Sequence, residues 1–132
     1  MANTKSSVLE MIDFYFSKFS FDHEKVSKQI YKKYNTNITI NYAENEEDKN
    51  LIRVTIDTNI SNEEENLKLY IQAVGFFKLN SEDMTEEISE QILKRNTVAI
   101  MFPIIRSQVS LLTTQPGLMP VMIQPIDFNS IE

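Results

Sequence analysis

The sequence has 132 residues and contains no cysteine, one histidine and two glycines. Without cysteine there is no disulfide, no thiolate catalysis and no cysteine-ligated zinc. The single histidine, His23, is the only possible base for a catalytic triad, and no G-x-S-x-G sequence supplies a nucleophile for it. Two glycines cannot build a phosphate-cradling loop, and the acidic runs lack the spacing and the glycine of an EF-hand. We therefore expect neither an enzyme nor a metal or other cofactor.

A basic face and a long apolar run are also missing. The formal net charge is −6. Because binding to nucleic acid needs a basic surface, we do not expect nucleic acid as a partner. The one lysine cluster, Lys25–Lys33, is interpreted as solvated surface. Glu10 and Asp13 interrupt the apolar residues at the N-terminus, so no signal-peptide h-region is present. No run reaches the ~18–20 apolar residues of a membrane helix, and we expect a cytoplasmic protein that does not insert into a membrane.

What the sequence does contain is apolar residues, which make up 42% of it and suit one packed domain over residues 1–132. They are concentrated at the C-terminal end, because the only charged residues from Asn96 onward are Arg106, Asp127 and Glu132. A domain of this size buries a modest share of its surface. Additional burial by oligomerisation is therefore expected.

The first two-thirds of the chain alternate in the manner of strands, at residues 12–21, 37–42, 51–60 and 66–79. In the first of these the parity of the apolar residues changes, which predicts a bulge near Ser17–Lys18. The third has one apolar and one polar face, the pattern of an antiparallel strand with one wet side. The fourth is apolar on both faces, because Tyr70, Val74 and Phe76 oppose the core-facing row. We expect its second face to contact another chain.

The C-terminal part predicts helices. Residues 81–95 have a helical composition with Ser81 as a candidate N-cap, and Asn96 and Thr97 are interpreted as a break. Residues 98–113 then carry an apolar stripe at helical spacing and a second stripe beside it, with Pro103 expected to kink the helix or to begin a new first turn. The first stripe consists of Val98, Met101, Phe102, Ile105, Val109 and Leu112, and the second of Ile100, Ile104 and Leu111. One stripe can cover a sheet, and the other needs a subunit or another polypeptide.

The stretch "PGLMPVMIQPIDF" (Pro116–Phe128) is too rich in proline for a helix or a sheet and too apolar for a solvated tail. We expect it to turn at Pro116–Gly117 and to lie back along the molecule. Three of its apolar side chains, those of Ile123, Ile126 and Phe128, are expected to pack against the core. Two others, those of Met119 and Met122, are candidates for a binding surface.

Two motifs in this region resemble the SecB protein-export chaperone family. The family's hydrophobic–Phe–Pro–x–x–Arg helix is matched by Met101, Phe102, Pro103 and Arg106. Its aliphatic–x–Pro–aliphatic–Asn–Phe stretch is matched by Ile123, Pro125, Ile126, Asp127 and Phe128, with aspartate in place of asparagine. Upstream, "FSFD" (Phe19–Asp22) is similar to the end of the family's first strand and "IQAVGFF" (Ile71–Phe77) to its fourth. The resemblance spans nearly the whole chain.

The resemblance implies an α+β fold, in which a four-stranded antiparallel sheet packs against a long helix in the C-terminal half. It also implies an ATP-independent holdase that binds unfolded or nascent polypeptides, or preproteins, in apolar grooves, and that assembles as a dimer of dimers. By this resemblance the client-binding groove would be lined by Ile30, Tyr31, Ile40, Met101, Phe102, Ile105, Met119 and Met122. The oligomer interface would involve Leu69, Tyr70, Ile71 and Phe76.

Other interpretations stay open at this point. Tyr70 stands at an acidic position of the family, and the chain stops at Glu132, before the family's second helix and acidic tail. Both departures weaken the expectation that the SecA motor docks here. Some SecB-like proteins serve toxin–antitoxin pairs, so the chain could instead be a dedicated module for one partner such as an antitoxin. A third interpretation is that oligomer contacts consume all the surplus apolar surface and leave no client groove.

Overall fold

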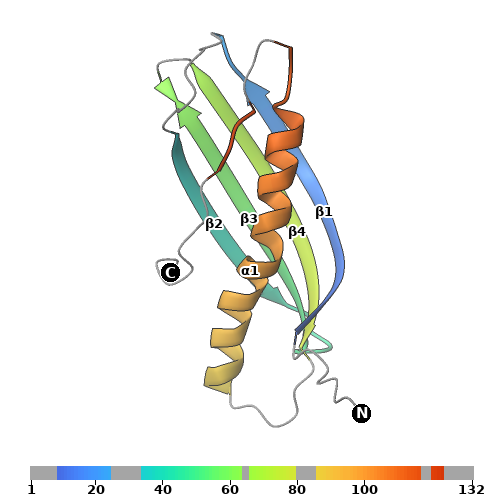
Figure 1. The fold of residues 1–132 in the computed structure, drawn as a ribbon. Helices are drawn as coiled ribbons and strands as arrows, with labels where there is room; N and C mark the ends of the chain where they lie inside the picture. Colours follow the sequence, from blue (N-terminus) through green and yellow to red (C-terminus); the bar gives the residue numbers. More distant parts are fainter. Residues whose placement is uncertain (1–8, 25–33, 64–65, 80–85, 117–119, 124–132) are drawn as a thin grey trace, which may run out of the picture.

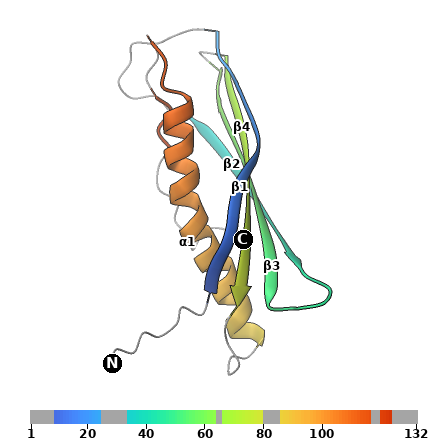
Figure 2. The same ribbon diagram turned by 90° about the vertical axis from the view of Figure 1, so that its right-hand side faces the viewer.

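The computed structural model of the protein describes residues 9–24, 34–63, 66–79, 86–116 and 120–123, and the side chains of its helix from Leu93 onward. Four strands form one antiparallel sheet in the order β1-β4-β3-β2. They are β1 (Leu9–Asp22), β2 (Asn35–Glu44), β3 (Leu51–Asn62) and β4 (Leu67–Leu79). The helix α1 (Glu86–Leu112) lies across one face of this sheet (Figures 1 and 2). The predicted α+β fold is confirmed.

The edge strand β1 contains two irregularities in its pairing with β4. The register shifts between Phe16 and Lys18, as the parity change predicted, and also between Met11 and Asp13, which was not predicted. Ser17 is the residue without a register partner at the shift between Phe16 and Lys18. Its hydroxyl donates a hydrogen bond to Oε1 of Gln72 at 2.5 Å. The bulge therefore keeps the apolar residues on both sides of it facing the helix, and its polar side chain is tied to the opposite face of the sheet.

The two faces of β4 differ as the sequence predicted. The side chains toward the helix are all buried, namely those of Leu67, Leu69, Ile71, Ala73, Phe77 and Leu79. On the other face, which we call the outer face, Val74 is buried while Tyr70 and Phe76 are half-buried. Strand β4 lies between β1 and β3, and the side chains of these neighbours partly cover it on the outer face, where no helix lies over the sheet.

The helix is continuous, and the predicted break at Asn96 and Thr97 is wrong. Thr97 is buried, and its hydroxyl donates a hydrogen bond to the carbonyl of Leu93 one turn earlier. Its polar group is thus satisfied inside the helix, which removes the reason for the chain to leave helical geometry there. Pro103 likewise lies inside α1 on its exposed side and does not begin a new helix. The predicted N-cap, Ser81, lies outside the described residues.

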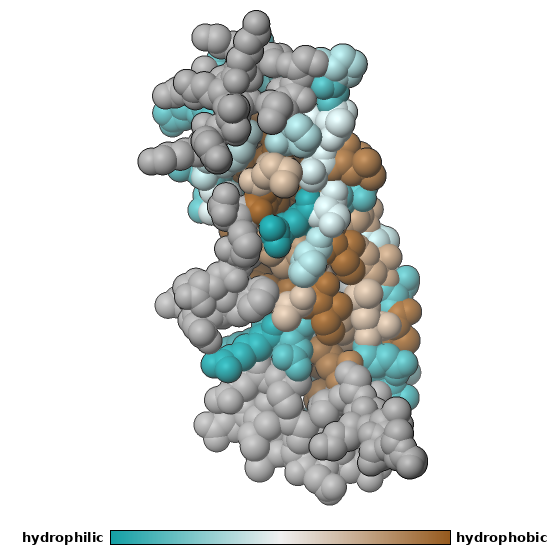
Figure 3. Space-filling view, in the orientation of Figure 1, coloured by the Kyte–Doolittle hydropathy of each residue, from teal (hydrophilic) through white to brown (hydrophobic). Residues whose placement is uncertain are grey.

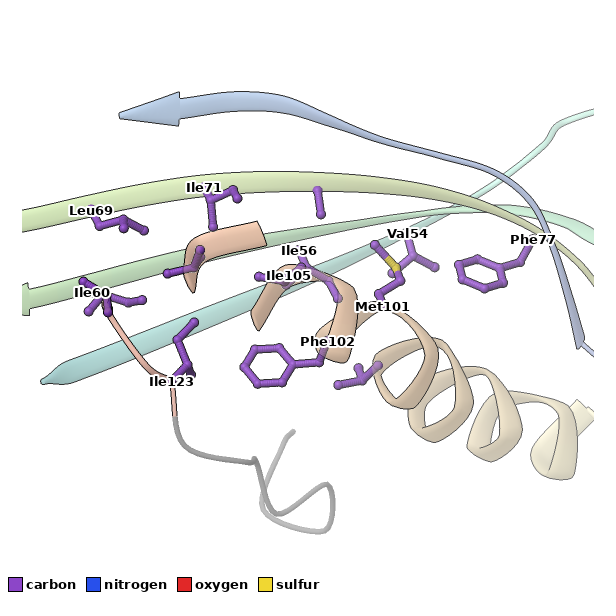
Figure 4. Packing of buried hydrophobic residues seen from close by; sticks show 14 of the residues in the cluster. Val54, Ile56, Ile60, Leu69, Ile71, Phe77, Met101, Phe102, Ile105 and Ile123 are labelled. Atoms are coloured by element: carbon purple, nitrogen blue, oxygen red, sulfur yellow. The ribbon is translucent and has the colours of Figure 1, made fainter. Parts of the chain in front are cut away.

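The core forms where the first apolar stripe of α1 meets the sheet. Met101 and Ile105 point from the helix toward the side chains of β3 and β4, while the ring of Phe102 lies toward Ile123 (Figure 4). The helix can approach this closely partly because β4 has a glycine at position 75. A Cβ atom there would lie 2.9 Å from Cε1 of Phe77 and 3.0 Å from Sδ of Met101, both closer than ordinary contacts. Gly75 thus makes room for the thioether of Met101 in the core.

After α1 the chain reverses and a short extended segment returns beside the helix (Figure 1). We call this segment, residues 120–123, the strap. Val121 and Ile123 are buried in the core cluster, as expected for Ile123, while Met122 between them is exposed. The other two residues expected to hold this stretch against the core, Ile126 and Phe128, lie outside the described residues.

A buried hydroxyl on β3 provides a test of this packing. Thr58 is fully buried on the helix-facing side of the sheet between Ile56 and Ile60, and within the described part of the chain its hydroxyl has no hydrogen-bond partner. An unsatisfied buried hydroxyl costs about 1–3 kcal/mol. The substitution Thr58→Val keeps the shape and removes that cost, so we expect it to raise the free energy of unfolding by about 1 kcal/mol in a urea titration.

The matched control is Thr55→Val on the outer face of the same strand, where Thr55 is half-buried. It should change the free energy of unfolding by less than about 0.5 kcal/mol. If Thr58→Val instead destabilises the protein by 1 kcal/mol or more, the hydroxyl has a partner and the packing described for this part of the core is wrong.

Candidate functional site

Large apolar side chains are exposed at two places on the described surface. Leu111, Leu112 and Met122 are exposed at the C-terminal end of α1 and on the strap, where Leu111 and Met122 reach 69% and 62%. Ile12, Tyr15 and Phe19 are exposed along the edge strand β1, where Ile12 and Tyr15 reach 54% and 46%. The face that carries α1 shows a band of apolar surface along the helix, with polar residues on either side (Figure 3). These two places are the candidates for contact with other molecules.

The first place is a groove between α1 and the strap, with a volume of about 560 Å³. We call it the α1–strap groove. Among its lining residues only Arg106 is charged, and the remainder are small polar or apolar groups. They are Pro103, Arg106, Ser107, Ser110, Leu111, Thr114, Met122 and Ile123. The groove therefore offers adaptable apolar surface from Leu111 and Met122 with little charge to select a particular partner.

Side chains of α1 hold the strap in place. The backbone N–H of Val121 donates to Oγ1 of Thr113 at 2.8 Å, and Nε of Arg106 donates to the carbonyl oxygen of Ile123 at 3.1 Å. The Thr113 hydroxyl in turn donates to the carbonyl of Val109 at 2.8 Å, which fixes its orientation. Oγ of Ser110 lies 3.5 Å from Sδ of Met122. One wall of the groove is therefore positioned by hydrogen bonds to its backbone rather than by regular secondary structure.

Three residues expected in the client groove are core residues in the structure. Met101, Phe102 and Ile105 lie between α1 and the sheet and have at most 2% of their surface exposed. A side chain with no exposed surface cannot line an open groove, so we reassign these three from groove to core. The physical reason is that the apolar stripe of α1 is used to cover the sheet, and it is the residues beside that stripe that reach the surface.

The other expected groove residues have different positions. Met122 lines the α1–strap groove, and its role in binding a client stays a prediction. Ile40 is half-buried on the edge strand β2 and packs against the core cluster. Ile30, Tyr31 and Met119 lie outside the described residues. Leu111 was not among the expected groove residues, although its place in the second helix stripe marked it as surplus apolar surface. The spacing of the residues did not predict the groove between α1 and the strap.

The residues expected at an oligomer interface divide between two faces. Leu69 and Ile71 face the helix and are buried in the core, so we also reassign them. Phe76 lies on the outer face and stacks with Tyr15 of β1, with 6.3 Å between the ring centroids. Beside them a pocket of about 280 Å³ is lined by Ile12, Leu51 and the Phe76 ring, among other residues. Glu44 and Arg53 also line this pocket, so this end of the outer face is open and mostly apolar, with charged groups beside the rings.

The other end of the outer face is polar and internally satisfied. The Tyr70 hydroxyl donates to the Asp57 carboxylate, and Nε2 of Gln72 donates to the same oxygen at 2.9 Å. The hydrogen bond to Asp57, followed by desolvation and by the charge of Asp57, raises the pKa of Tyr70 above its ordinary value. Because Gln72 also receives the bond from Ser17, this network links β1, β4 and β3. Tyr70 thus has a structural role in addition to its position near a possible interface.

In the part of the chain that the structure describes, no helix has the length and hydrophobicity to cross a membrane.

Comparisons with known proteins agree with this architecture. The model of the SecB family, described as preprotein translocase subunit SecB, matches residues 2–131. The protein-export protein SecB of Orientia tsutsugamushi (strain Boryong) is 30% identical over 125 residues, which are 89% of this chain and 76% of that protein. An uncharacterized protein of Methanocaldococcus jannaschii, MJ0357, is 25% identical over 122 residues, covering 91% of this chain and 75% of that protein.

Among solved structures, the fold is similar to that of the SecB-like chaperone Rv1957 of Mycobacterium tuberculosis, which was determined in complex with a ChAD peptide from the Rv1956 HigA1 antitoxin. The TM-score is 0.70 at 16% identity, and the match covers 89% of this chain and 90% of that one. At 16% identity the similarity to this structure shows the fold, whereas the match to the family model and the 30% identical relative show the family. The chain therefore belongs to the SecB family of protein-export chaperones.

Proposed function

We propose that this protein is an ATP-independent holdase that binds unfolded or nascent polypeptides through the α1–strap groove. As a member of the SecB family it is a chaperone rather than an enzyme. The observation that carries the proposed site is the exposure of Leu111 and Met122, two large apolar side chains on opposite walls of one groove with a single charged lining residue. Such a groove suits an apolar segment whose sequence is not specified.

The physics of this site favours weak and repeated contacts. Apolar burial contributes about 25 cal/mol per Å², so two exposed side chains provide only a few kcal/mol to any one client segment. Several such sites along one unfolded chain would add up to useful affinity through multivalency. Because Leu and Met side chains adapt to many shapes, discrimination among clients would be low, which is the requirement for a holdase.

A dedicated role for one partner is the second candidate. The SecB-like chaperone of Mycobacterium tuberculosis binds a peptide from an antitoxin, and this chain has a similar fold. Under this proposal the same groove would hold one aggregation-prone partner such as an antitoxin. A pull-down separates the two candidates, because a general holdase retains many unfolded proteins and a dedicated one retains a single stoichiometric partner. Docking to SecA is a further proposal, which a binding assay with purified SecA would test.

We also propose that copies of this chain associate as a homo-oligomer, as a dimer of dimers, through the exposed edge of β1. This strand of 14 residues lies at the edge of the sheet, and Ile12, Tyr15 and Phe19 are exposed along it, with Tyr15 on the outer face and Phe19 on the helix-facing side. Long apolar edge strands are normally covered, because their free backbone groups pair readily with other chains. The stacked rings of Tyr15 and Phe76 extend the same apolar surface onto the outer face.

Cytoplasmic localisation is proposed on the basis of the family.

Removing the two exposed groove side chains tests the holdase site. We expect the double substitution Leu111→Ser/Met122→Ser to raise the concentration needed for half-maximal protection about tenfold, because it removes one to two kcal/mol of apolar contact. The measurement is light scattering of a chemically denatured client diluted into buffer. The control is Leu112→Ser, which removes an exposed neighbour that does not line the groove. If the wild-type protein fails to suppress aggregation at stoichiometric ratios, the holdase proposal itself is wrong.

The proposed interface is tested by substituting the stacked pair on the outer face. Tyr15→Ser/Phe76→Ser should lower the native mass of the protein in size-exclusion chromatography with light scattering, since two aromatic rings leave the contact. Thr39→Ala on the opposite edge strand β2 serves as the control and should retain the wild-type mass. An unchanged mass in the aromatic double variant argues that assembly does not use this surface.

A further inference from the structure

The strap packs against the rest of the protein as a short segment of irregular backbone. Its side chains alternate in, out and in, because Val121 and Ile123 are buried while Met122 is exposed, as in an extended strand. Its backbone makes one hydrogen bond as a donor, from Val121 N–H to Thr113, and one as an acceptor, from Arg106 to the Ile123 carbonyl. Both partners are side chains of α1. The strap is therefore recognised through its extended backbone and two alternate apolar residues.

The strap lies in a seat that α1 and the sheet form together. In Figure 4 the Ile123 side chain lies on the helix side of the sheet, in the region of Ile60 on β3 and of Phe102 and Ile105 on α1. The helix passes diagonally over the sheet, and the strap fills part of the area that the helix leaves uncovered (Figure 1). Two buried side chains and two backbone hydrogen bonds anchor the described strap, besides the weak contact of Ser110 with Met122. The seat therefore recognises mainly features that many polypeptides share.

We propose that the strap is an intramolecular competitor for this seat, and that a client displaces it with an extended segment carrying apolar residues at positions i and i+2. The inference rests on the proposed chaperone function and adds a second step to it. After the first contact at the α1–strap groove the client takes the seat of the strap, so the seated strap limits the affinity for the client. Thr113 offers an acceptor and Arg106 a donor to the backbone of the incoming segment, and these pair with any sequence. The two buried positions select apolar side chains without selecting a particular one.

Competition of this kind has a quantitative consequence. The apparent dissociation constant equals the intrinsic constant divided by the fraction of protein with an open seat. A strap that is seated nine-tenths of the time weakens client binding about tenfold, and one that is fastened permanently nearly abolishes binding at the seat. The affinity for a client should therefore fall when the strap is fastened and rise when it is loosened.

The absence of cysteine from the chain allows the strap to be fastened by one introduced disulfide. Oγ of Ser110 and Sδ of Met122 are 3.5 Å apart, so these two side chains face each other across the gap between α1 and the strap. The sulfur of a cysteine at position 122 would lie nearer the strap backbone than Sδ of Met122, so formation of the S110C/M122C disulfide is first verified with a free-thiol assay. The probe is a permanently unfolded, cysteine-free polypeptide labelled with a fluorophore, and binding is followed by anisotropy. We expect the oxidised protein to bind at least about tenfold more weakly than the same protein after reduction.

Two controls separate fastening of the strap from changes in the groove. S110C/M122C with both thiols capped by methylthio groups carries the same substitutions and added sulfur without joining the strap to α1, and should bind like the reduced double variant. The loosened variant V121S/I123S should bind the probe more tightly than the wild type, by up to about tenfold. If the disulfide fails to form, this variant decides the question, provided that it retains the wild-type circular dichroism spectrum.

The outcomes separate this inference from the proposed function. If the wild-type protein does not bind the unfolded probe, the chaperone proposal fails. If the wild type binds but the oxidised and reduced forms of S110C/M122C have equal affinity, the competitor inference is overturned and the holdase proposal stands. Equal or weaker binding by folded V121S/I123S overturns it in the same way.

Discussion

The structure depends on one geometric constraint, which is that a single helix must cover a sheet of four long strands. A helix is about 10 Å wide, whereas four strands spaced about 4.8 Å apart present a wider face. Helix α1 crosses the sheet diagonally and so covers part of every strand without covering any edge strand along its whole length (Figure 1). The apolar side chains of the edge strands are left half-buried, among them Phe14 and Phe16 on β1 and Ile38 and Ile40 on β2. The surplus apolar surface is thus a direct result of the architecture.

The strap and the exposed residues are two responses to that surplus. The strap adds Val121 and Ile123 to the core beside the helix and is held by Thr113 and Arg106. It leaves Leu111 and Met122 exposed at the α1–strap groove, and among the described residues Ile12, Tyr15 and Phe19 remain exposed along the edge strand β1. A chaperone that works without a nucleotide needs apolar surface that is available without an energy input. In this account the incomplete coverage of the sheet supplies that surface, and the strap limits its exposure.

The sequence predicted the strands, their wet and dry faces and the bulge at Ser17, because the period of two and its parity change are local signals. It predicted a break at Thr97 wrongly, since it could not show that the hydroxyl would bond to Leu93 within the helix. It also placed Met101, Phe102 and Ile105 in the groove, because an apolar stripe does not reveal which of its residues the sheet will bury. The strap's anchors were beyond prediction, because they join side chains of α1 to backbone atoms far along the chain.

The central claim is that an unfolded polypeptide binds at the surface which α1 leaves incompletely covered. The most direct measurement is methyl NMR of the protein with and without an unfolded client. The account predicts that the signals of Leu111, Met122 and Ile123, at the groove and the strap, shift or broaden, while those of Leu69 and Ile71 beneath the helix do not. A client that binds without changing the three groove and strap signals, or that perturbs both sets alike, would contradict it.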